Sequence, residues 1–130
     1  MTSAATPYLL VFLGGGVGSA LRLALFHLCR LWLPPGFPYG TLVVNVVGSL
    51  AVGAAAGWLL NRSAGGVDPL ALLLVTGVLG GFTTFSAFSL DALLLWQKGD
   101  HAACLAYVVG SVLLSLLAVV AGLSLVRWLG

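Results

Sequence analysis

The sequence predicts an all-α integral membrane protein with four transmembrane helices in a single domain, residues 1–130. Charged residues make up 6% of the chain and hydrophobic residues 61%, whereas a soluble domain carries about 25% charged residues. Four long runs contain no Asp, Glu, Lys or Arg: residues 1–21, 31–61, 69–90 and 101–126. A helix needs about 20 apolar residues to cross a bilayer. Four such helices use nearly the whole chain and leave no room for a soluble catalytic domain.

The first two predicted spans cover residues 8–32 and 40–60. The turn Pro34-Pro35-Gly36 ends the first span, because the residue before a proline disfavours the helical conformation. A tryptophan falls near the end of each of the four predicted spans, as in the aromatic belts of membrane proteins: Trp32, Trp58, Trp96 and Trp128.

The third predicted span covers residues 70–96, and the sequence favours a break in it near mid-membrane. Asp68 and Pro69 predict its start, since Asp is a good helix cap and Pro is tolerated in the first turn. A continuous helix of this length would measure about 40 Å and overshoot the bilayer core. Gly80-Gly81-Phe82-Thr83-Thr84 combines glycines with β-branched hydroxyl residues, which weaken a helix. The alternative is close helix packing through small residues. The fourth span covers residues 101–128.

The positive charges are balanced across the membrane. With four spans, Arg62 and Arg127 lie on the side of the N-terminus, and Arg30 and Lys98 lie on the other side. The positive-inside rule therefore has no difference to act on. We expect the chain to insert in both orientations and to form an antiparallel homodimer, the alternative being one orientation chosen by weaker features.

Two glycine pairs at four-residue spacing, Gly14 with Gly18 and Gly53 with Gly57, let helix backbones approach closely. They favour helix association, but these glycines alone do not encode the partner.

Polar side chains inside the spans are costly and are therefore candidates for function. Thr41, Asn45 and Ser49 form a stripe on the second helix, because residues four apart share a helix face. Amide and hydroxyl donors can replace part of the hydration shell of a small anion. A second stripe of hydroxyls runs along the fourth helix: Tyr107, Ser111 and Ser115. The alternatives are interhelical hydrogen bonds for Asn45 and serine bonds to the helix's own carbonyls.

Four further residues in the spans are candidates with a structural alternative. Arg22 can attract an anion into a vestibule or extend to the lipid headgroups. Phe85 and Phe88 share a helix face, and their positive ring edges can contact an anion, although core packing is the ordinary role. Asp91 can line a vestibule or pair with Arg22, and the sequence leaves this open.

Several function classes find no support in the residues. The net charge of +2 is small and scattered, so it favours neither a nucleic-acid surface nor an acidic substrate. His27 and His101 have no metal-ligand spacing, and Cys29 and Cys104 fit small buried hydrophobic residues. No nucleophile motif is present, so we expect no enzyme activity.

Three segments resemble the signature stretches of the Fluc (CrcB) family of fluoride channels, in order and at the right spacing. They are Gly14-Gly15-Gly16-Val17-Gly18-Ser19-Ala20-Leu21-Arg22, Gly40-Thr41-Leu42-Val43-Val44-Asn45-Val46-Val47-Gly48 and Gly80-Gly81-Phe82-Thr83-Thr84-Phe85-Ser86-Ala87-Phe88. The last is the most specific of the three.

The resemblance implies a fluoride-selective passive channel of the bacterial cell membrane, which exports F⁻ and lowers cytoplasmic fluoride. It implies an antiparallel dual-topology homodimer in the lipid bilayer, with a structural Na⁺ at the dimer interface. Backbone carbonyls of Gly80 and Thr83 would hold this ion, and oxygen ligands at a helix break suit a hard cation. Arg22 and Asp91 are expected in the vestibule. The implied pore residues are Thr41, Asn45, Phe85, Phe88, Tyr107, Ser111 and Ser115.

The chain departs from the family pattern at a few positions. Ala87 stands where members often have Thr, and Asp91 where they often have Glu; Ser19 and Leu23 replace the usual Ala and Tyr. The alternative function is a small dual-topology, proton-coupled cation or multidrug antiporter, but such proteins depend on a glutamate in the first helix and this chain has no Glu. A structural membrane protein that conducts nothing would not explain two hydroxyl stripes.

Overall fold

The computed structural model describes residues 4–60 and 68–129, and these residues form helices joined by turns, with no strand among them. Four helical segments are long and apolar enough to cross a membrane: Thr6–Trp32, Tyr39–Leu60, Pro69–Gln97 and His101–Leu129. The prediction of an all-helical chain with four membrane-spanning helices is confirmed.

The turns between the helices follow local residue chemistry. α1 (Thr6–Trp32) ends where Leu33 adopts extended backbone before the prolines. Gly36 has a φ of 104° in the turn that leads to α2 (Tyr39–Leu60), and Gly99 has a φ of 79° before α6 (His101–Leu129). Glycine adopts these positive φ values without the steric cost that other residues meet.

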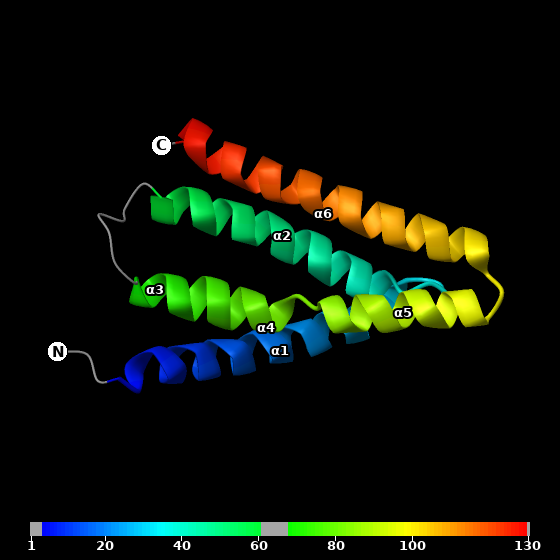
Figure 1. Cartoon of the computed structure of the whole chain (residues 1–130), viewed down its shortest axis with the longest axis horizontal. Helices are drawn as coiled ribbons and strands as arrows, with labels where there is room; N and C mark the ends of the chain where they lie inside the picture. The colour runs from blue at the N-terminus through cyan, green and yellow to red at the C-terminus, as the bar shows by residue number, and fades with distance from the viewer. Residues whose placement is uncertain (1–3, 61–67, 130) are drawn as a thin grey trace.

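The third segment is made of several parts. They are α3 (Pro69–Ala71), the π-helix η1 (Leu72–Leu79), α4 (Gly80–Phe82) and α5 (Phe85–Gln97). Asp68 caps its start as predicted, because its Oδ1 accepts a 2.8 Å hydrogen bond from the Leu70 N–H. Between α4 and α5, Thr83 and Thr84 adopt extended backbone, with ψ of 158° and 118°. Figure 1 shows this stretch as a thin link between two helical halves that continue in the same direction.

The four segments lie alongside one another in an up-and-down bundle. Figure 1 shows the two termini at one end, and the α1–α2 and α5–α6 turns at the other. α1 packs mainly against η1 and α4, whereas α2 packs mainly against α6.

The two glycine pairs serve contacts within the chain. A Cβ on Gly14 or Gly18 would collide with backbone of η1, at Leu73 and Val78 respectively. A Cβ on Gly53 would collide with the Val119 carbonyl of α6. These glycines therefore let α1 approach η1 and α2 approach α6. The sequence had not identified which helices they contact.

Most of the large apolar side chains point outward. In the described part of the chain, the only fully or nearly buried apolar residues are Val44, Leu95 and Tyr107, while Tyr8, Phe12, Trp32 and Trp128 are among the exposed ones. This pattern fits a helix bundle in hydrocarbon. There, burial of apolar surface contributes little to helix association, and close van der Waals packing stabilises it instead.

Candidate functional site

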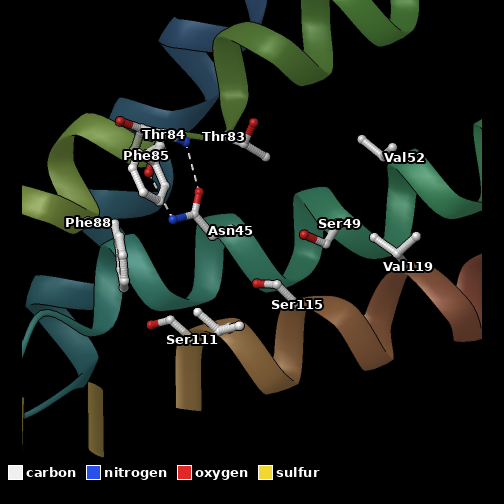
Figure 2. Close-up of a pocket in the computed structure, with 11 residues that line it drawn as sticks. Asn45, Ser49, Val52, Thr83, Thr84, Phe85, Phe88, Ser111, Ser115 and Val119 are labelled. Carbon is white, nitrogen blue, oxygen red and sulfur yellow. Dashed lines mark hydrogen bonds between the residues drawn. The ribbon is translucent and has the colours of Figure 1, made fainter. Parts of the chain in front are cut away.

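The side chain of Asn45 on α2 holds the extended stretch between α4 and α5. Its Nδ2 donates a 2.9 Å hydrogen bond to the Thr84 carbonyl, and its Oδ1 accepts a 2.8 Å bond from the Thr84 N–H. Figure 2 shows both bonds, with the amide of Asn45 facing the Thr84 backbone across the gap between two segments. The interhelical role considered for Asn45 is therefore present, and Nδ2 keeps a second hydrogen for another acceptor.

Thr84 also starts α5. Its Oγ1 accepts a 3.1 Å hydrogen bond from the Ala87 N–H, which is the geometry of a helix N-cap. Thr83 instead donates its hydroxyl hydrogen to the Leu79 carbonyl at 2.9 Å, and α4 ends here because Thr83 adopts a ψ of 158°. The two adjacent threonines thus lie at the end of one helix and at the start of the next.

Beside this stretch lies a pocket of about 300 Å³ between the third segment, α2 and α6. Figure 2 draws the residues that line it: Asn45, Ser49, Val52, Thr83, Thr84, Phe85, Phe88, Ser111, Val112, Ser115 and Val119. Five of the seven residues expected in the pore meet here: Asn45, Phe85, Phe88, Ser111 and Ser115.

Ser111 is the one pocket hydroxyl that is buried without any hydrogen-bond partner among the described residues. The residue is 4% exposed, and its hydroxyl does not bond the carbonyl one turn earlier on α6. A buried hydroxyl without a partner costs free energy unless something outside the chain accepts its hydrogen. The pocket therefore holds an available donor.

The two phenylalanines differ in exposure. Their ring centroids lie 5.4 Å apart, and Phe88 also contacts Tyr107 at 5.3 Å. Phe85 is 78% exposed, which is unusual for a residue in a core. Within this single chain, Phe85 is therefore not packed as a core residue.

Asp91 lies in a second polar cluster. Its Oδ2 accepts hydrogen bonds from Thr41 Oγ1 at 2.6 Å and from the Tyr107 hydroxyl at 3.3 Å. Tyr107 is fully buried and meets Phe37 edge to face at 5.6 Å. The shorter Asp at this position thus still reaches both hydroxyls.

Thr41 and Asp91 border a larger pocket of about 590 Å³ at the α1–α2 turn, where Arg30 is also in the lining. This pocket combines charged and polar side chains with apolar ones, as a vestibule for ions would. Arg30 and Cys29 also line this pocket, but the sequence did not identify them as site residues. A cation near a helix end looks like an ordinary flanking charge, and Cys29 fitted a small buried hydrophobic residue.

Arg22 lies elsewhere. It lines a separate pocket of about 400 Å³ with Thr84, Ser86 and Ala87, and its Nη1 approaches the Thr83 carbonyl at 3.4 Å. Asp91 accepts from two hydroxyls, and the described contacts of this chain include no bond between Asp91 and Arg22. The two residues expected in one vestibule thus border different pockets of the chain.

Carbonyl oxygens are the candidates for holding a cation. Among the described residues there is no group of three His, Cys, Asp or Glu side chains that could bind a metal. In an α-helix the carbonyl of residue i accepts the N–H of residue i+4. For Gly80 and Thr83 those donors are the N–H groups of Thr84 and Ala87, which bond Asn45 and the Thr84 hydroxyl instead. Two backbone oxygens between α4 and α5 thereby lose their usual helical donors.

The comparisons with known proteins agree on one family. Residues 9–123 match the family model described as "CrcB-like protein, Camphor Resistance (CrcB)". The chain is 53% identical over 122 residues to the "Fluoride-specific ion channel FluC" of Paracoccus denitrificans, covering 94% of this chain and 95% of that protein. It is 47% identical to "Fluoride-specific ion channel FluC 2" of Nitrobacter hamburgensis, covering 94% and 98%. It is 50% identical to the "Fluoride-specific ion channel FluC" of Rhizobium meliloti, covering 92% and 94%.

Proposed function

The chain belongs to the CrcB-like family, and we propose that, like the relatives named above, it is a fluoride-specific ion channel, here of the bacterial cell membrane. The observation that supports this best is the pocket beside Thr84, which contains the buried Ser111 hydroxyl that has no hydrogen-bond partner among the described residues. Membership in a channel family puts the chain among transport proteins and not among enzymes.

The pocket offers the chemistry that a small anion needs. Fluoride holds its water strongly, so a pore must supply several donors together before the anion can leave water. The Ser111 hydroxyl, the second amide hydrogen of Asn45 and the hydroxyls of Ser49 and Ser115 are such donors. The ring edges of the phenylalanines carry partial positive charge and add a further contact. No lysine or arginine of the described residues lines this pocket, so an anion is not held there by a fixed positive charge.

Transport then needs no coupling site. A negative-inside membrane potential drives an anion outward with about 2.3 kcal/mol per charge for each 100 mV. Fluoride that enters an acid-exposed cell as neutral HF loses its proton in the cytoplasm and is trapped as the anion. A passive pore is enough to export it.

We further propose that two copies assemble as an antiparallel homodimer with dual topology. The charge count supports this, since the sequence predicts Arg62, which lies outside the described residues, on the same side as Arg127, and Arg30 and Lys98 on the other. The exposed Phe85 ring also supports it, because a second copy would supply the wall that one chain lacks at this side of the pocket.

The carbonyls of Gly80 and Thr83 fit the proposed structural Na⁺. Both oxygens have lost their helical donors, and hard cations prefer oxygen ligands of this kind. The Thr83 carbonyl also accepts a 3.4 Å hydrogen bond from Arg22 Nη1. In the described contacts, no positively charged side chain bonds the Gly80 carbonyl. When bound, the ion would offset the negative ends of these carbonyl dipoles. An antiparallel pair would contribute both oxygens twice.

Fluoride efflux from liposomes tests the conduction proposal. Purified protein is reconstituted, valinomycin clamps the potential through K⁺, and chloride is measured in parallel. We expect rapid fluoride release with negligible chloride release. Release of neither anion from folded protein would contradict the proposal, and proton-driven uptake of an organic cation would favour the antiporter class instead.

A further inference from the structure

Asn45 joins the anion pocket to the proposed cation site. We propose that Asn45 is a positioning residue for that site: by taking the Thr84 N–H, it keeps the Gly80 carbonyl oxygen available for sodium. This inference rests on the proposed sodium site, and it gives Asn45 a role beyond that of an anion donor.

The argument begins with the helical hydrogen-bond register. If α4 continued into α5 without interruption, the Thr84 N–H would donate to the Gly80 carbonyl. It donates instead to Asn45 Oδ1 at 2.8 Å, and the amide is fixed from its other end by a 2.9 Å bond to the Thr84 carbonyl. The side-chain amide of Asn45 thus bonds both the N–H and the carbonyl of Thr84 at once. The register is therefore held open from outside the third segment, by a residue of α2.

The second oxygen is freed differently. The Ala87 N–H, which would otherwise serve the Thr83 carbonyl, donates to the Thr84 hydroxyl at 3.1 Å. That bond lies within one segment and needs no help from α2. Loss of the Asn45 side chain should therefore return the Gly80 oxygen to the helix but leave the Thr83 oxygen as it is.

The same amide borders the pocket that contains Ser111 (Figure 2). One side chain thus contacts the proposed anion path and fixes the backbone that presents a carbonyl to the cation. A change at Asn45 should alter two properties together, fluoride conduction and sodium affinity, although no part of Asn45 binds sodium.

Two substitutions separate these functions. Asn45→Ala removes the acceptor for the Thr84 N–H, whereas Asn45→Asp retains an acceptor oxygen but, as the carboxylate, has no donor hydrogens. The readout is the midpoint of thermal unfolding in detergent, titrated with NaCl against N-methyl-D-glucamine chloride. A ligand that binds only the folded state raises this midpoint with its concentration. Ser49→Ala is the matched control, one turn further along α2 in the same pocket and with no bond to Thr84.

We expect Asn45→Ala to weaken the apparent sodium affinity by about 10- to 100-fold, the usual effect of losing a residue that orients a metal ligand. Asn45→Asp should keep or raise the wild-type sodium affinity while losing fluoride efflux in liposomes. Ser49→Ala should keep the wild-type sodium affinity. If Asn45→Ala does not elute as the folded species, Asn45→Ser replaces it, since the shorter hydroxyl does not reach the Thr84 N–H. If neither folds, a loss of sodium affinity in Asn45→Asp, which keeps the acceptor oxygen, would contradict the inference.

Two results would overturn the inference while leaving the sodium site intact. One is a wild-type sodium affinity in folded Asn45→Ala, and the other is an equal loss of affinity in Asn45→Ala and Asn45→Asp, which would make packing the cause. A wild-type protein without any sodium-dependent shift would refute the sodium site together with this inference. Fluoride efflux in the same protein would then still report on the pore separately.

Discussion

Among the described residues, one buried polar side-chain atom has no hydrogen-bond partner, and the contrast with its paired neighbours is informative. Asn45 meets both peptide groups of Thr84, and Asp91 accepts from Thr41 and Tyr107. In hydrocarbon such pairing is nearly obligatory, because no water is present to take its place. Ser111 is buried without a partner in the described part of the chain, so its hydrogen is available to an ion in the pocket.

Ser111→Ala should separate stability from conduction. An unsatisfied buried hydroxyl costs about 1–3 kcal/mol, so its removal should leave the free energy of unfolding unchanged or slightly higher. Fluoride efflux should fall, because the pocket loses a donor. Unfolding in SDS followed by far-UV circular dichroism gives the first quantity, and liposome efflux gives the second.

Ser124→Ala is the control, since Ser124 lies on the same helix, is exposed and is absent from the pocket lining. It should match the wild type in both assays. A Ser111→Ala protein that is less stable than wild type but conducts at the wild-type rate would contradict the assignment of this hydroxyl to the anion.

The sequence predicted the residue types of the site better than their grouping. Periodicity alone aligned Asn45 with Ser49 and Ser111 with Ser115, and all four line one pocket. Periodicity could not show that Arg22 and Asp91 line different pockets, because long-range packing determines which helices face each other. The role of Thr84 was missed, since its contribution is through the backbone and its cap, which a hydroxyl in a span does not reveal.

Helix contacts in this chain depend on glycine positions where two backbones approach closely. On α1, Gly18 faces the Val78 carbonyl of η1, whereas Gly16 has nothing within 4 Å of where its Cβ would be. The two positions therefore form a matched pair for testing how α1 is held.

Gly18→Ala should destabilise the fold and Gly16→Ala should not. Overpacking costs about 1–3 kcal/mol, and Gly18→Ala should lie at the upper end because the obstacle is backbone and cannot rotate away. Gly16→Ala should gain about 0.5–1 kcal/mol from the better helix propensity of alanine. SDS unfolding of both variants checks this, and equal stabilities would show that α1 is not held by this contact.

The helices themselves were predictable from uncharged runs, because the bilayer imposes a length and the chain has few charges with which to interrupt it. Asp68 and the prolines set the ends of helices through local chemistry, which one sequence contains in full. The π-helical turns of η1 were not predicted: Leu72–Leu79 has the composition of an ordinary apolar helix, and no single-sequence signal distinguishes the wider turn.

The described helices form a bundle in which α1 begins and α6 ends at the same end (Figure 1), and the sequence predicts little difference in charge between the two ends. In that prediction Arg62, which lies outside the described residues, and Arg127 are balanced by Arg30 and Lys98. Orientation in the membrane is set by small differences in Lys and Arg near the ends of spans. A few added charges should therefore fix the orientation of every copy.

A biased variant tests whether activity needs both orientations. Pro35→Arg with Gln97→Arg adds two positive charges at the end of the α1–α2 and α5–α6 turns, and Ala4→Arg with Leu129→Arg adds two at the other end. Each variant alone should insert in one orientation, as measured by labelling of an engineered cysteine from each side of the membrane. Each alone should then lose fluoride efflux, because an antiparallel pair cannot form.

Co-expression of the two oppositely biased variants should restore efflux, since each then finds a partner of the other orientation. This restoration distinguishes loss of the dimer from damage to the fold, because neither set of substitutions lies in the pocket beside Thr84. A variant that inserts in a single orientation and still conducts on its own would rule out the antiparallel dimer. The exposed Phe85 ring would then need a parallel partner or lipid as its neighbour.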